Sequence, residues 1–64
     1  MPQPLFTVGQ ELRARRDHDH VPAGTMVHIE RVTEPRPGEF EYYVEFDQGR
    51  RTIMVESTLR ALSR

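Results

Sequence analysis

The sequence contains no cysteine among its 64 residues. Without cysteine, no disulfide can staple the fold and no thiolate can act as a nucleophile or a metal ligand. A chain of this length buries only about 60% of the surface that its unfolded form exposes, so we expect marginal stability. Small domains without such staples often gain burial by self-association, and we therefore expect a homo-oligomer.

The sequence also lacks a long apolar run and an excess of charge of one sign. No apolar stretch approaches the roughly 20 residues of a membrane span, and residues 1–4 (MPQP) have neither the basic start nor the apolar core of a signal peptide. We therefore expect a cytoplasmic protein without a membrane partner. The 9 basic and 10 acidic residues give a net charge of −1, which argues against a nucleic-acid partner because nucleic-acid binders are usually clearly basic.

The strongest pattern that is present runs from residue 39 to residue 55 (EFEYYVEFDQGRRTIMV). In its first half the apolar residues fall on every second position, which predicts a strand with one buried face. Gly49 can adopt the positive φ of a tight turn, so we expect a β-hairpin that turns at residues 47–49. In the second strand of this hairpin the expected buried residues are Ile53 and Val55, and the expected outward residues are Thr52 and Met54.

The rest of the chain predicts short segments between polar loops. Pro2 and Pro4 keep the start of the chain out of a helix. Leu59 and Leu62 are three residues apart, which suits one turn of 3₁₀ helix or a short closing strand, whereas no segment keeps a 3.6-residue period long enough for a full helix. The other expected segments, in chain order, are an extended lead (1–5), a strand (10–15), a loop (16–22), a strand (25–32) and a loop (33–38).

These segments predict a single all-β domain over residues 6–64. The expected architecture is a small five-stranded SH3-like barrel with a short 3₁₀ turn near the C-terminus, because closure into a barrel removes exposed sheet edges. The residues expected in its interior are Leu12, Val27, Ile29, Phe40, Tyr42, Val44, Phe46, Ile53, Val55, Leu59 and Leu62.

A series of short motifs runs along the chain, namely residues 6–13 (FTVGQELR), Gly24, residues 43–45 (YVE), residues 49–54 (GRRTIM) and residues 59–62 (LRAL). Their order and spacing resemble the type II dihydrofolate reductases, a plasmid-borne, trimethoprim-insensitive family of SH3-like barrels. Residues 49–54 are similar to the active-site strand, which in the family carries Val-Gln-Ile-Tyr. Only Ile53 of that motif is kept, and the family's strand-one lysine falls at Ala14.

The resemblance implies NADPH-dependent reduction of dihydrofolate to tetrahydrofolate. In the family, hydride passes between stacked nicotinamide and pteridine rings in a pore shared by associated barrels, and the catalysis is mostly proximity and orientation. The implied reaction site is the strand Thr52, Ile53 and Met54. The implied cofactor contacts are Arg13, Arg15, Arg51, Thr52 and Ile53, and the implied substrate contacts are Arg15, Tyr43 and Met54.

Other readings of the same residues remain open. The arginines at 13, 15, 16, 50 and 51 either hold anionic ligand groups or form a solvated face balanced by nearby glutamates. Tyr43 and Met54 suggest an interface or a stacking platform, or else ordinary scattered apolar surface. The histidines and aspartates of residues 17–20 are consecutive in one loop, so no metal is expected. The alternative function is a non-catalytic SH3-like binding module for a protein or nucleic-acid partner.

Overall fold

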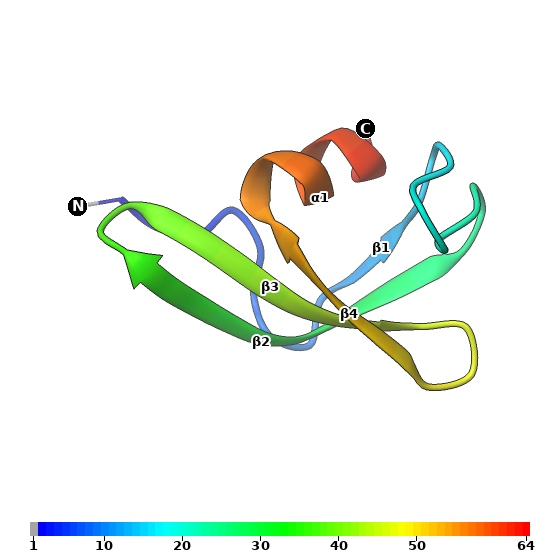
Figure 1. Ribbon diagram of the computed structural model, residues 1–64, viewed down its shortest axis with the longest axis horizontal. Coiled ribbons are helices and arrows are strands. Elements are labelled where there is room, and N and C mark those ends of the chain that lie inside the picture. The colour runs from blue at the N-terminus through cyan, green and yellow to red at the C-terminus, as the bar shows by residue number, and fades with distance from the viewer. Residues whose placement is uncertain (1) are drawn as a thin grey trace.

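The computed structural model describes residues 2–64, so Met1 of the predicted lead lies outside the described residues. Four antiparallel strands form one sheet and one short helix follows them (Figure 1). The elements are β1 (Glu11–Arg13), β2 (Met26–Arg36), β3 (Glu39–Phe46), β4 (Arg50–Val55) and α1 (Glu56–Ser63). The expected mostly β domain is confirmed. The expected five-stranded closed barrel is wrong for residues 2–64, because their sheet has four strands in the order β1-β2-β3-β4 and keeps β1 and β4 as its two edges.

The hairpin of β2 and β3 is longer than predicted. The loop expected at 33–38 is wrong, because β2 continues to Arg36 and pairs there with Glu39. Only Pro37 and Gly38 form the turn, with Gly38 at φ +78°, as a turn with proline followed by glycine favours. A register irregularity between residues 33 and 36 accommodates Pro35, since a bulge does not need the N–H that proline lacks.

The hairpin of β3 and β4 turns through three residues, 47–49, because Phe46 pairs with Arg50. All three loop residues have positive φ, at +46°, +59° and +90°. An odd number of loop residues keeps the even-numbered positions of both strands on one face. Met54 is therefore buried at 3% exposure, while Ile53 is 51% exposed.

The predicted burial pattern of β4 is therefore wrong. Ile53 and Val55 face outward, and Met54 faces the core. A loop of two residues would have produced the opposite pattern, because a register slip by one residue moves every side chain to the other face.

The core lies between the inner face of the sheet and α1, which crosses over β3 and β4 (Figure 1). Most of the predicted interior is confirmed, whereas Leu12 is only half-buried and packs against the core. Ala14, which alternation along residues 10–15 directs inward, is buried as well, and so are Phe6 and Val21, which the expected interior did not include. The predicted interior residues that are buried are Val27, Ile29, Phe40, Tyr42, Val44, Phe46, Leu59 and Leu62.

The C-terminal segment is an α-helix of 8 residues rather than the predicted 3₁₀ turn. Leu59 and Leu62 form its buried face, and packing of such a face stabilises a helix that is too short to persist alone. The amide of Arg15 donates to the carbonyl of Leu62 over 2.8 Å, so the end of the helix is tied to the chain just after β1. No helix within residues 2–64 has the length and apolar character needed to cross a membrane.

The register of β4 gives a paired prediction. Met54→Asp should unfold the domain, because it places an unpartnered carboxylate in the core at a cost of several kcal/mol. Ile53→Asp introduces the same group on the exposed face of the single chain and, at concentrations where both chains are monomeric, should leave a cooperative melt close to that of the parent chain. Thermal unfolding followed by circular dichroism measures both. A folded Met54→Asp beside an unfolded Ile53→Asp would reverse the register.

Candidate functional site

Strand β4 has a free edge. Its residues pair with β3 on one side, and in residues 2–64 no backbone hydrogen bond joins the other side to another segment. The opposite edge differs, because β1 is only 3 residues long and the Arg15 amide just beyond it bonds to α1. An exposed row of strand N–H and C=O groups is a template for pairing with another chain. Arg50–Val55 is therefore the part of this sheet best placed to bind an extended segment.

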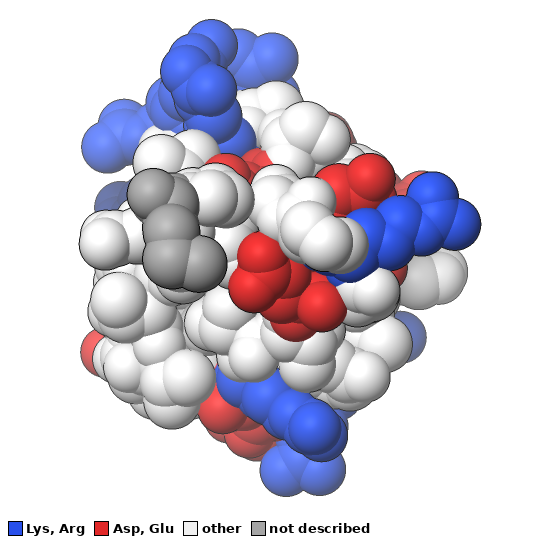
Figure 2. Space-filling view, turned by 90° about the vertical axis from the view of Figure 1, so that its left-hand side faces the viewer, with Lys and Arg blue, Asp and Glu red and all other residues white. Residues whose placement is uncertain are grey.

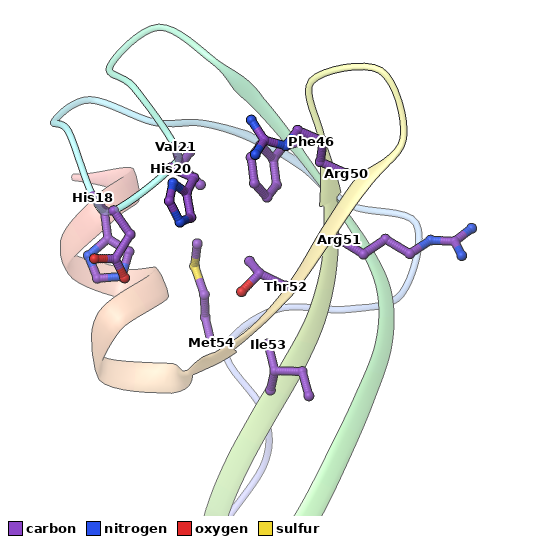
Figure 3. Close-up of a pocket in the computed structure, with 10 residues that line it drawn as sticks. His18, His20, Val21, Phe46, Arg50, Arg51, Thr52, Ile53 and Met54 are labelled. Carbon is purple, nitrogen blue, oxygen red and sulfur yellow. The ribbon is translucent and has the colours of Figure 1, made fainter.

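A cleft of about 160 Å³ lies beside the inner face of β4, between this strand and the loop at residues 18–21 (Figure 3). Its floor is apolar and buried, and Thr52 is half-buried at its side. Figure 3 shows Thr52, Met54 and His20 directed toward the same space, whereas Arg51 points away. The lining residues are His18, Asp19, His20, Val21, Phe46, Arg50, Arg51, Thr52, Ile53 and Met54.

The far wall of this cleft is a tight turn. The backbones of His18 and Val21 exchange hydrogen bonds of 2.9 and 2.7 Å, and Asp19 takes φ +48°, which aspartate tolerates better than most residues. The amide of Ala23 donates to Asp17 Oδ1 over 2.8 Å. This turn buries the Val21 side chain to 2% exposure. The predicted loop 16–22 is therefore ordered, and its one signal in the sequence is a single valine among polar residues.

The amino end of β4 is basic. The Arg50 guanidinium lies 6.0 Å from the centre of the Phe46 ring and 3.9 Å from Asp47 Oδ2. Arg51 lies on the outer face, where its Nε is 3.1 Å from Glu30 Oε1. Both arginines line the cleft, and Arg50 has a long contact of 3.9 Å to an exposed carboxylate.

The carboxyl end of β4 is acidic. A second cleft of about 250 Å³ lies there, and three glutamates, Glu39, Glu41 and Glu56, are among the residues that line it. Figure 2 shows acidic side chains near the centre of the end of the molecule that carries the turn between β2 and β3, with basic side chains toward its margins. The edge strand therefore runs from a basic end to an acidic end. The remaining lining residues are Pro35, Gly38, Phe40, Val55 and Ser57.

Tyr42 holds Glu56 at this acidic end. The buried phenol donates to Glu56 Oε2 over 2.8 Å and accepts a longer bond of 3.4 Å from the Phe6 amide. Burial, followed by the hydrogen bond to Glu56, raises the pKa of Tyr42 to about 12. The ring also meets the Phe6 ring edge-on, with centroids 5.5 Å apart. One side chain therefore links the start of the chain, β3 and the first residue of α1.

The outer face of the sheet carries an apolar stripe. Tyr43 pairs with Ile53 across β3 and β4, and with Arg31 across β2 and β3. The Arg31 guanidinium lies 5.5 Å from the centre of the Tyr43 ring. Val55 extends the stripe, and its side chain is 47% exposed.

The predicted site residues do not gather at one place in a single chain. Of the predicted reaction strand, Thr52 and Met54 line the cleft from the inner face, while Ile53 turns to the outer face. The expectation that Met54 is exposed is wrong, because its side chain forms part of the core. The other predicted contacts are dispersed, with Arg13 and Arg15 at the β1 end of the sheet and Tyr43 and Arg51 on the outer face. Within residues 2–64, no group of three or more histidine, aspartate or glutamate side chains is placed to hold a metal ion.

The link through Tyr42 predicts a loss of stability that depends on pH. Tyr42→Phe should lower the free energy of unfolding by about 1–3 kcal/mol, because it leaves buried hydrogen-bond partners unsatisfied. The folded pKa of Tyr42 is raised to about 12, so this contribution is complete below the ordinary tyrosine pKa of about 10 and is lost as the pH rises toward 12. Denaturant titrations across this range measure the effect. Tyr43→Phe, on the exposed face, is the control, and equal losses in both variants would contradict the prediction.

No family model, no curated protein and no solved structure matches the chain. The resemblance of residues 6–62 to the type II reductases therefore stays a prediction. What the chain does must be inferred from the geometry of β4 and its two clefts.

Proposed function

We propose that this chain is a non-catalytic binding module that takes an extended segment of a protein partner on the edge of β4. The observation that carries the proposal is the free edge of Arg50–Val55, on the side away from β3, alongside the cleft at residues 18–21. In recognition by strand addition, main-chain hydrogen bonds supply affinity and pockets for alternate side chains supply specificity. Both parts are available at this edge.

The size of the cleft favours a side chain over a cofactor. Sites for small molecules usually enclose roughly 300–1,000 Å³, whereas this cleft holds about 160 Å³. Alternate side chains of an added strand point to opposite faces. One such side chain would enter the cleft over Met54 and Phe46, and its neighbours would extend the outer stripe beside Ile53.

The charges along β4 define the chemistry of the partner segment. An added antiparallel strand places its carboxyl end opposite Arg50 and its amino end opposite Glu56. The favoured segment is therefore basic at its amino end, apolar in its centre and acidic at its carboxyl end. Charge complementarity of this kind contributes orientation and specificity more than affinity.

A designed peptide tests this binding mode. The probe is a short blocked peptide in which valine and threonine alternate between an amino-terminal arginine and a carboxyl-terminal glutamate. It should shift the amide resonances of Arg50–Val55 and of residues 18–21. Arg50→Glu should weaken binding about tenfold, since it opposes like charges, whereas Arg60→Glu on the exposed face of α1 should not. The same peptide with its two charges exchanged is the matched ligand control, and equal binding of both peptides, or shifts elsewhere in the sheet, would refute this mode.

We propose as a second function the NADPH-dependent reduction of dihydrofolate at a site formed between associated chains. What favours it is that Thr52 and Arg50 border a cleft on the strand that resembles the family's active strand. A site shared between chains is also consistent with a cleft too small for both ligands in one chain. For either function we propose a cytoplasmic protein that self-associates.

An activity assay separates the two functions. If the chain is a reductase, it should oxidise NADPH in the presence of dihydrofolate, trimethoprim should not inhibit it, and Arg15→Ala should raise KM for one of the two ligands. If the chain is a binding module alone, NADPH is not oxidised and neither ligand shifts the amide resonances of residues 50–56. The second result would eliminate the reductase.

A further inference from the structure

We infer that the segment which fits the β4 edge is β4 of a second copy of this chain, paired antiparallel about a two-fold axis at Ile53. This inference rests on the proposed function, because it uses the same edge and names its occupant. The segment that the edge favours is basic, then apolar, then acidic. Residues 50–56 read RRTIMVE, so β4 together with the first residue of α1 has this order.

The position of the axis follows from the pairing rules. A two-fold axis perpendicular to the sheet keeps both outer faces on the same side, so outward residues must oppose outward residues. An axis at Ile53 places Arg50 opposite Glu56 of the second copy. An axis at Thr52 places Arg50 opposite Met54, and an axis at Met54 places Thr52 opposite Glu56, so neither of these joins opposite charges. Of these three axes, the axis at Ile53 places opposite charges together, and symmetry forms the pair of Arg50 and Glu56 twice.

The side chains of Arg50 and Glu56 are both accessible for this contact. Arg50 projects beside the cleft, where it lies 6.0 Å from the centre of the Phe46 ring and 3.9 Å from Asp47 Oδ2, and its side chain is 57% exposed. Tyr42 anchors the Glu56 carboxylate through Oε2, which leaves Oε1 to accept from a guanidinium. A charge-assisted pair with one partner already held in place loses less side-chain entropy on forming.

The pairing also covers the apolar stripe at its open end. Ile53, 51% exposed in the single chain, meets Ile53 of the second copy, and directly opposed apolar side chains stabilise a sheet. The Tyr43 rings of the two copies then flank this central pair across a continuous sheet. A small domain without disulfides gains burial in this way, and its free edge is removed.

Cysteine substitution tests the register, since the chain has no cysteine of its own. Opposed Cβ atoms in antiparallel strands lie about 4.5–5.5 Å apart, close to the reach of a disulfide. Ile53→Cys alone should therefore form a covalent dimer under mild oxidation. Arg51→Cys alone should not, but a mixture of Arg51→Cys and Val55→Cys should form the mixed dimer. Val8→Cys, in an exposed turn far along the chain from β4, is the control for random collision.

Sedimentation of the full chain gives the second measurement. The parent chain should be a dimer, and Ile53→Lys should raise the dimer dissociation constant at least about tenfold, because two lysines then face each other on the axis. Val8→Lys should leave the dissociation constant unchanged. A parent chain that is monomeric at about tens of micromolar, a dimer unaffected by Ile53→Lys, or equal cross-linking at positions 51, 53 and 55 would each overturn self-pairing.

The designed peptide distinguishes a failure of self-pairing from a failure of the strand-binding function. If the chain is monomeric and the peptide still shifts the β4 amides, self-pairing is wrong and the strand-binding function is retained. If the chain is monomeric and the peptide leaves the β4 amides unchanged, both proposals fall.

Discussion

The turn at residues 47–49 is the constraint on which the rest of this structure depends. Its three residues put Met54 opposite Tyr42, so the thioether closes the core and forms part of the cleft floor. The same turn directs Ile53 and Val55 to solvent and creates the outer stripe. A turn one residue shorter would bury the branched pair and expose Met54. The length of this turn therefore determines which β4 side chains form the core, which line the cleft and which lie on the exposed face.

How much the sequence predicts differs between neighbouring strands for a physical reason. In β3 the apolar residues other than Tyr43 occupy one face, so alternation identifies the buried set and the structure confirms it. In β4 the residues Ile53, Met54 and Val55 are consecutive, and alternation then cannot choose between the faces. The choice comes from three positive φ angles at 47–49, and only Gly49 signals such a conformation in advance. The prolines of β2 and its turn were equally ambiguous, because proline is compatible with a loop and also with a strand that contains a bulge. A bulge accommodates Pro35 within β2, and the turn consists only of Pro37 and Gly38.

The candidate site was only partly predictable. Thr52 and Met54 were named from the sequence and do line the cleft, although Met54 does so as a core residue. The opposite wall depends on Val21, which is buried because the tight turn at residues 18–21 directs its side chain into the core. Hydrophobic periodicity cannot predict such a turn, because the surrounding residues are polar. The predicted barrel also concealed the main feature of the site, because a closed barrel has no edge to offer.

The two edges of this sheet are unequal, and their inequality sets a limit on growth. β1 has 3 residues, presents Glu11 and Arg13 to solvent and is followed at once by the bond from Arg15 to Leu62. Short, charged and covered edges resist pairing, whereas a sheet with two receptive edges can add copies without end and form fibres. When a sheet has a single edge that can pair, a dimer formed through that edge has no free edge left to bind a third copy. Association of copies through β4 would therefore be self-terminating, and such a fold could carry an exposed strand without the hazard of polymerisation.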